Sequence, residues 1–282
     1  MKRTNRKESI MQNRRSIFRI ASVLQILVVI PIIGITQVCQ VHYQSVDVNE
    51  GLSSGYVNDL TRDGNGFLWI ATQDGINRYD GRKIEVLRSN PNDSLSLAFD
   101  NVTALAAFEK GKLVLGGSTG QLQFLDFIEE KSSTLFIEEL QGKSVRQIEV
   151  AEGIIYVTTE DDLILLNKQK QQVKSINPLK NLGKIFFIEK NQLGMIWLSS
   201  ENGLYIGRDN GGFKKLPNSK GLDIIDITGN ESESWALSDD AIYFIGSNLK
   251  PVKVEIQNFN IANFGFKMIA VNENDVLLGR SE

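Results

Sequence analysis

The chain has 282 residues, with 31 Lys and Arg against 34 Asp and Glu, and 41% of its residues are hydrophobic. This composition is that of an ordinary globular protein and excludes a disordered or collagen-like chain. A single cysteine, Cys39, and a single histidine, His42, exclude an intrachain disulfide framework and metal sites built from several Cys or His ligands. The sequence therefore predicts no catalytic residue, no cofactor and no bound metal.

The net charge of −3 conceals a basic N-terminus. Residues 1–19 hold seven Lys and Arg side chains and one acid, Glu8. The rest of the chain keeps 24 of the 31 basic and 33 of the 34 acidic residues, so its net charge is −9. Because an acidic body repels phosphate backbones, we expect no nucleic-acid partner for the folded part.

A long apolar segment follows the basic tail. No charged residue lies between Ile20 and Val46, and Ile, Val and Leu dominate as far as Val38. Roughly 20 helical residues cross a hydrocarbon layer about 30 Å thick, so residues 20–41 are predicted to form one hydrophobic helix. A retained transmembrane signal anchor and a cleaved signal peptide are both open. The length of the run favours the anchor, and the basic tail predicts a cytoplasmic N-terminus with the rest exported.

The remainder of the chain is repetitive. A short apolar strand, small residues, a turn and a second apolar strand recur at spacings of 45, 42, 41, 38 and 42 residues. The second residues of the six copies are Trp69, Val114, Tyr156, Trp197, Trp235 and Leu277. Four short strands in a period of roughly 40–50 residues are typical of a β-propeller blade. We therefore predict an all-β fold over residues 42–282, a β-propeller of about five four-stranded antiparallel blades plus a partial sixth.

Three tryptophans share one position of the repeat. Equivalent placement of Trp69, Trp197 and Trp235 predicts a shared structural role, which is to fill the gap between adjacent blades. A sugar-stacking role for one of them is the alternative.

Turn residues separate the strands. Asp74-Gly75 and Asn202-Gly203 are predicted to form type I′ hairpin turns. Residues 63–66, Asp-Gly-Asn-Gly, are predicted to form a further turn; they resemble the start of a calcium loop but lack its downstream Glu. The acidic pairs Asp161-Asp162 and Asp239-Asp240 are interpreted as solvated turn residues, with calcium ligation as the alternative.

The segment 51–81 resembles a known repeat. It reads GLSS at 51–54, VNDL at 57–60, DGNGFLWIAT at 63–72 and DGINRYDG at 74–81. This is similar to the two-component regulator propeller repeat, found in the periplasmic sensor halves of hybrid two-component histidine kinases of Bacteroidetes-type bacteria. Residues 194–206 carry about half of the motif. Ala71 and Ser199 replace the glycine that is usual after the tryptophan.

The resemblance implies a sensor in the bacterial inner membrane, with the propeller in the periplasm. Such a propeller perceives a small-molecule ligand, often an oligosaccharide, and passes the signal to a cytoplasmic histidine kinase that controls transcription. A homodimer, as in related sensors, is part of this expectation. No second hydrophobic span and no kinase motif are found in the sequence, so the chain is expected to be a non-enzymatic input portion. The last repeat breaks off at 279–282, so we expect a fragment; closure of the ring by residues 41–50 is the alternative.

Two other functions stay open. A membrane-anchored propeller that only binds proteins is predicted to carry a contiguous exposed apolar patch on the blade rim. A propeller glycan lyase or hydrolase is predicted to hold two or more carboxylates with shifted pKa values in a pocket. The ligand-binding residues stay unknown, because one sequence does not show which loop side chains gather in space.

Overall fold

The computed structural model of the chain divides into two units, residues 1–45 and 46–282. It describes residues 46–167, 179, 181–191, 194–208, 212–229, 233–255, 261, 268–271 and 276–279. The predicted hydrophobic helix at 20–41, the basic tail, Cys39 and His42 lie outside these residues. Among the residues described, no helix is long and apolar enough to cross a membrane.

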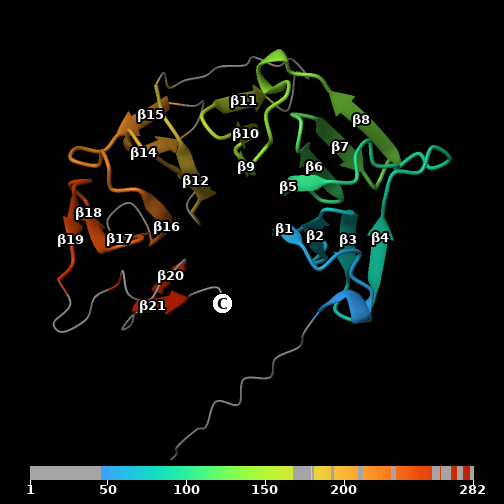
Figure 1. The fold of residues 1–282 in the computed structure, drawn as a ribbon, viewed down its shortest axis with the longest axis horizontal. Helices are drawn as coiled ribbons and strands as arrows, with labels where there is room; N and C mark the ends of the chain where they lie inside the picture. Colours follow the sequence, from blue (N-terminus) through green and yellow to red (C-terminus); the bar gives the residue numbers. More distant parts are fainter. Residues whose placement is uncertain are drawn as a thin grey trace, which may run out of the picture. The chain divides into compact units, whose positions relative to one another are not determined.

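The described part of the second unit folds into six antiparallel sheets that follow one another along the chain (Figure 1). The first two sheets have four strands each: β1 (Val57–Arg62), β2 (Leu68–Thr72), β3 (Gly75–Tyr79), β4 (Ile84–Leu87), and β5 (Val102–Glu109), β6 (Lys112–Gly117), β7 (Leu122–Asp126), β8 (Lys131–Leu135). The third sheet has three described strands: β9 (Gln147–Ala151), β10 (Ile154–Thr158) and β11 (Leu163–Asn167).

The fourth and fifth sheets again have four strands: β12 (Ile185–Lys190), β13 (Ile196–Ser200), β14 (Gly203–Arg208), β15 (Gly212–Lys215), and β16 (Ile224–Gly229), β17 (Glu233–Ser238), β18 (Ile242–Gly246), β19 (Pro251–Lys253). The sixth pairs β20 (Met268–Val271) with β21 (Val276–Gly279). Strand order in each sheet follows chain order. The predicted all-β propeller of about five blades and a partial sixth is confirmed.

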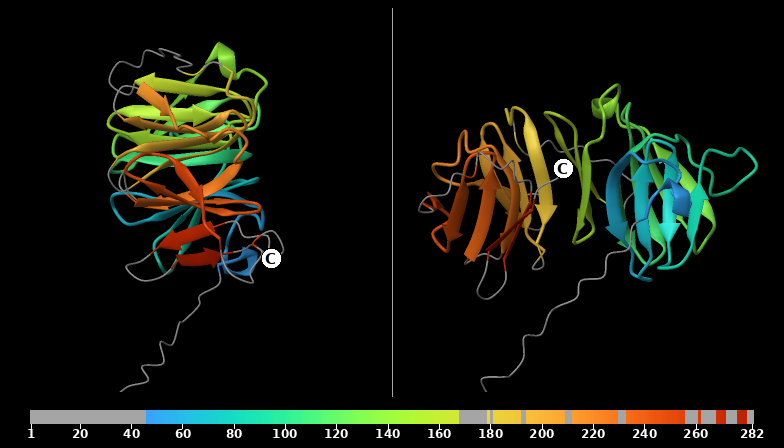
Figure 2. Two further views of the ribbon diagram at one scale, coloured as in Figure 1. Left: turned by 90° about the vertical axis from the view of Figure 1, so that its left-hand side faces the viewer. Right: turned by 60° about the horizontal axis from the view of Figure 1, so that its bottom comes forward.

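The first strand of each blade contacts the first strand of the next, in the order β1, β5, β9, β12, β16 and β20. These inner strands lie side by side, and β4, β8, β15 and β19 form the rim (Figures 1 and 2). Two 3-10 turns, Val48–Glu50 and Glu138–Leu140, complete the described structure. Residues 48–50 form no strand, so the described part of the 41–50 segment does not supply the closing strand considered above.

The period of the sequence corresponds to one strand of each blade. The six positions that define it, from Trp69 to Leu277, all lie on the second strand of their sheets: β2, β6, β10, β13, β17 and β21. Trp69 and Trp197 are buried between neighbouring blades, and Trp235 is half-buried against the cluster between the fifth and sixth. Their predicted role in filling the space between blades is confirmed.

The predicted type I′ turns are wrong in detail. Thr72 pairs with Gly75, so the two-residue loop is Gln73-Asp74, and only the glycine has positive φ (+93°). A type I′ turn needs positive φ at both loop residues; here the glycine follows the loop in the left-handed region, as in the longer bulged hairpins. The hairpin at 200–203 has the same form. Glycine is required at position 75, because a Cβ there would lie 2.2 Å from the Leu87 carbonyl oxygen.

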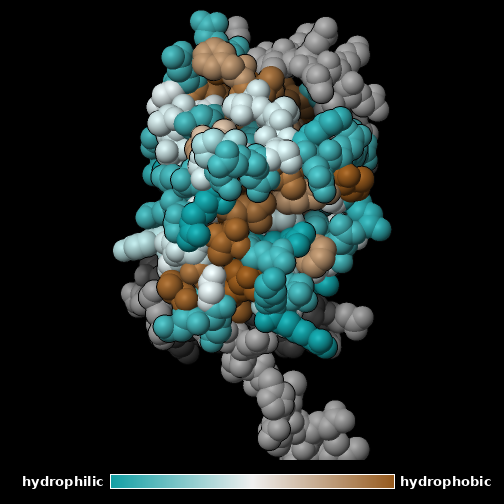
Figure 3. All heavy atoms as spheres, turned by 90° about the vertical axis from the view of Figure 1, so that its right-hand side faces the viewer, coloured by the Kyte–Doolittle hydropathy of each residue, from teal (hydrophilic) through white to brown (hydrophobic). Residues whose placement is uncertain are grey.

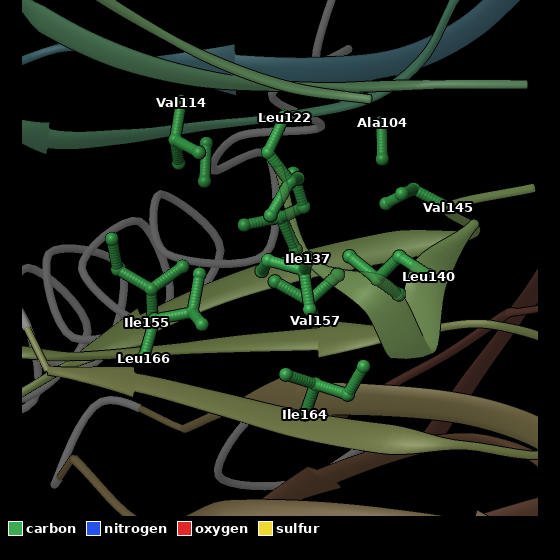
Figure 4. Close-up of a cluster of buried hydrophobic side chains, with 12 residues drawn as sticks. Ala104, Val114, Leu122, Ile137, Leu140, Val145, Ile155, Val157, Ile164 and Leu166 are labelled. Carbon is green, nitrogen blue, oxygen red and sulfur yellow. The ribbon is translucent and has the colours of Figure 1, made fainter. Parts of the chain in front are cut away.

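The hydrophobic core is divided among the blade interfaces. Five clusters of buried side chains each join two consecutive sheets. Figure 4 shows the cluster between the second and third, where Val114 and Leu122 of one sheet face Ile155 and Val157 of the next, with Leu140 at one side. Burial of such a side chain stabilises the fold by about 1.5–3 kcal/mol. The blades therefore hold one another through apolar contacts between their faces.

Candidate functional site

Polar side chains on three inner strands connect consecutive blades. Each accepts a hydrogen bond from a backbone N–H of the next blade's inner strand: Asp59 Oδ2 from Leu105 (2.9 Å), Gln147 Oε1 from Ile188 (2.9 Å) and Asp226 Oδ2 from Ile269 (2.7 Å). Asp59 and Asp226 also accept the N–H of the residue that follows them in the chain. These bonds fix the spacing of the blades where the inner strands meet.

Two glutamates also lie on the inner strands. Glu149 lies on β9 and Glu189 on β12, and burial raises the pKa of each carboxyl to about 7. The charge of Asp226 raises the pKa of Glu189 further, and Lys190 opposes the rise at Glu149. Burial also raises the pKa of Asp59 and of Asp226, against the lowering effect of their backbone N–H donors.

Glu189 and Asp226 form a carboxyl pair between the fourth and fifth blades, because their side chains are hydrogen-bonded to each other. Two carboxyl groups in such contact retain a proton to higher pH than either would alone. The pair is thus neutralised in part near pH 7. Raised carboxyl pKa values are the feature expected of a propeller enzyme. Three of the four acids here, Asp59, Glu189 and Asp226, are engaged in contacts between blades.

Sequence reasoning missed these four acids. The available signal was an acid enclosed by apolar neighbours on the strand before the aromatic strand, as in Ile148-Glu149-Val150 and Ile225-Asp226-Ile227. An acid within an apolar strand has to find a partner when it is buried, so this pattern could have marked the inner strands.

The acid that begins the predicted turn at 63–66 is fully engaged within the protein. Asp63 Oδ1 accepts the N–H groups of Asn65 (2.8 Å) and Phe67 (3.1 Å), and Oδ2 accepts the indole N–H of Trp69 (2.9 Å). The interpretation as a hairpin turn is confirmed. These bonds hold Trp69 against the strand that carries it.

The two acidic pairs also lie in turns, and side chains nearby contact them. Lys143 forms ion pairs with Asp161 (3.5 Å) and with Asp162. Asp240 accepts a hydrogen bond from the Ser238 hydroxyl at 2.7 Å. Within the described ranges, no three His, Cys, Asp or Glu side chains are grouped so that they could hold a metal ion.

A pocket of about 560 Å³ opens among the loops next to the Asp161 turn. Its lining comes from three segments: the connection that enters β9, the β10–β11 loop and the two residues that precede β12. The lining residues are Gly142, Lys143, Ser144, Arg146, Thr159, Glu160, Asp161, Gly183 and Lys184. Hydroxyls, carboxylates and cations thus face one space, and this set can bind a hydroxyl-rich ligand through hydrogen bonds. None of the four acids of the inner strands lines it.

Hydrogen bonds hold the pocket loops to the blades. The Arg146 N–H donates to the Thr158 carbonyl (2.8 Å), and the Ile185 N–H donates to the Glu160 carbonyl (2.7 Å). The Thr103 hydroxyl donates to the Val145 carbonyl at 2.6 Å. The backbone of the pocket is therefore pre-organised, and its side chains supply the specificity.

Comparison with known proteins identifies the repeat. Residues 51–74 match the profile of the family described as two component regulator propeller. The chain carries a two-component regulator propeller repeat. A stretch of 56 residues, 20% of the chain, is 39% identical to Histidine kinase P4 of Formosa agariphila and covers 4% of that protein. The resemblance recognised in residues 51–81 is thereby confirmed.

Solved structures share the propeller fold. Two extracellular domains of proposed hybrid two component systems from B. thetaiotaomicron superpose with TM-scores of 0.66 and 0.54, at 16% and 20% identity. They match 88% and 84% of this chain, which spans 36% and 40% of their own lengths. Virginiamycin B lyase from Staphylococcus aureus superposes with a TM-score of 0.60 at 15% identity, over 80% of this chain and 78% of the lyase. Likenesses at these identities establish the fold alone.

Proposed function

We propose that this chain is the ligand-sensing input propeller of a membrane-bound two-component sensor. The observation that carries the proposal is the regulator propeller repeat at 51–74, together with the local identity to a histidine kinase. In this proposal the propeller binds the ligand and transmits the signal, and phosphoryl transfer belongs to the kinase part of the sensor.

The proposal places the propeller in the periplasm. Residues 20–41 anchor it in the inner membrane, and residues 1–19 lie in the cytoplasm, as the basic tail predicts. The sensor domains of B. thetaiotaomicron that share its fold are extracellular, which supports this location. The partners are a small-molecule ligand, the membrane and a second copy of the chain, and nucleic acid is not among them.

Protease accessibility tests this topology. Spheroplasts of a bacterium that expresses the full chain are treated with protease from outside, with and without detergent. We expect digestion of the propeller in intact spheroplasts while an N-terminal epitope stays protected. Protection of the propeller until detergent is added would refute the exported location and with it the sensing role.

The ligand we propose is an oligosaccharide, bound in the pocket beside β9 and β12. The support is its volume of about 560 Å³ and its lining of hydroxyl, carboxylate and cationic groups, which match the alternating donors and acceptors of sugar hydroxyls. Calorimetric titration of the detergent-purified chain with a panel of tetrasaccharides tests this. Ser144 is an exposed hydroxyl of the lining, and Arg82 is exposed in the β3–β4 turn away from the pocket. Binding that is weakened in Ser144→Ala and kept in Arg82→Gln would support the pocket as the site.

A protein-contact role is the second candidate. Figure 3 shows a band of apolar side chains on the side that carries β4 and β8, framed by hydrophilic residues. Every residue of β4, including Ile84 and Val86, is half-buried rather than covered. If this band joins two copies, Val86→Lys will convert a dimer to a monomer in analytical ultracentrifugation. A Val86→Lys variant that stays dimeric would show that the apolar band is not the dimer contact.

A further inference from the structure

The pocket on the loop face differs in charge from the body around it. The chain beyond residue 19 carries a net charge of −9, yet in this one space the cations Lys143, Arg146 and Lys184 outnumber the acids Glu160 and Asp161. Lys143 is engaged by Asp161 and Asp162. Two cations, Arg146 and Lys184, and one carboxylate, Glu160, then remain in the lining to meet a ligand.

These two cations are available to a ligand. Both side chains are exposed, and neither forms an ion pair with an acid of the described ranges. Arg146 is held through its backbone N–H, which leaves the guanidinium unrestrained. The Lys184 ammonium lies 5.9 Å from the centre of the Phe186 ring, which accepts a cation on its face without neutralising it.

The acids in and beside the pocket differ in how far they are engaged by other groups of the protein. Asp161 is paired with Lys143, whereas the Glu160 side chain is exposed and open to a ligand. Beside the pocket, Glu201 Oε2 accepts the backbone N–H of Lys184 at 3.1 Å. Carboxylates at the edge of a site accept hydrogen bonds from sugar hydroxyls, whereas a guanidinium binds a carboxylate or sulfate in a bidentate manner. The lining thus combines carboxylate acceptors for hydroxyls with two cationic donors.

We propose that the pocket binds an acidic oligosaccharide, with Arg146 and Lys184 holding a carboxylate or sulfate group of the ligand. This inference rests on the proposed sensing function and specifies the chemical class of its ligand. Carboxylate and sulfate share the chemistry that Arg146 and Lys184 recognise, and the test separates them.

Titration calorimetry with the full chain in detergent compares three probes: tetragalacturonate, a sulfated carrageenan tetrasaccharide and the neutral maltotetraose. We expect an acidic tetrasaccharide to bind at least tenfold more tightly than maltotetraose. Arg146→Gln or Lys184→Gln should weaken that binding about tenfold, as loss of a charge-assisted hydrogen bond does, and Arg146→Lys should recover part of it. Added salt should weaken binding to the wild type.

A matched control is Arg82→Gln. Arg82 is exposed in the β3–β4 turn. This turn lies at the opposite end of its blade from the β2–β3 loop, which corresponds to the β10–β11 loop of the pocket. Substitution of Arg82 removes the same charge as the pocket variants do. It should leave the affinity unchanged. Circular dichroism checks that all variants keep the fold, which their exposed positions favour.

The outcomes separate the two proposals. Preference for one acidic probe, weakened by the pocket variants and not by the control, supports the inference and identifies the anion. Equal binding of all three probes, unchanged by the variants, overturns the acidic ligand and leaves oligosaccharide sensing in place. Absence of binding by all three overturns the oligosaccharide ligand altogether, while protease accessibility still decides the location of the propeller.

Discussion

The carboxyl pair between the fourth and fifth blades makes stability depend on pH in a definite direction. Glu189 has a pKa of about 7 in the folded chain against an ordinary value of 4.5. Below about pH 4.5 the group is protonated in both states. As pH rises from 4.5 through 7 the unfolded chain loses this proton first, so the pair's contribution to the free energy of unfolding falls. Above pH 7 the loss is complete.

The magnitude follows from the pKa change. A rise from 4.5 to about 7 corresponds to at most about 3.4 kcal/mol. Part of the side chain remains open to solvent, which reduces the expected loss to about 1.5–2 kcal/mol. Besides its partner Asp226, the charged group that acts on Glu189 is Glu149, which in turn is influenced by Lys190 and Asp59. The strand on the other side of the pair, β20, has no titratable residue.

Glu189→Gln isolates this contribution, because glutamine keeps the size and a donor for Asp226 but does not titrate. Urea denaturation of wild type and variant, followed by tryptophan fluorescence, is measured at pH 5 and pH 8.5. We expect a variant more stable by about 0.4 kcal/mol at pH 5 and by about 1.5–2 kcal/mol at pH 8.5. Glu255→Gln, at an exposed acid, should show no such difference. An equal shift at both pH values, or a variant less stable at pH 8.5, would refute the reasoning.

Three further changes test the fold. Gly75→Ala should lower the free energy of unfolding by about 1–3 kcal/mol more than Gly81→Ala, since both have positive φ but only at position 75 does a Cβ meet a carbonyl oxygen, and urea midpoints compare them. Asp63→Ala should lower the free energy of unfolding by about 2–3 kcal/mol by the same assay and red-shift Trp69 emission. Asp63→Asn keeps an acceptor oxygen and should lower it less; an equal loss in the two variants would contradict the role of these hydrogen bonds. Leu122→Ala, at a fully buried site between the second and third blades, should cost about 2–5 kcal/mol, and a cost under 1 kcal/mol would exclude tight packing there.

Only part of the candidate site could be predicted from the sequence. Asp161 was recognised as a turn residue, because turns have local chemical signatures. Its neighbours in the pocket were not recognised, since Arg146 and Lys184 belong to different connections and meet Asp161 only when three segments converge. The Glu189–Asp226 pair was missed for the same reason, because its members lie on different blades.

The sequence by itself determined the blade and its repetition. Alternating apolar residues, turn glycines and the recurring aromatic specify strands and hairpins through interactions within about 40 residues, so the all-β propeller and its repeat family could be predicted from residues alone. Only the tertiary structure decided the loop geometry, the acids shared between blades and the grouping of charges in the pocket. Those features depend on which side chains of separate blades come into contact, and that is set by the packing of one apolar face against the next.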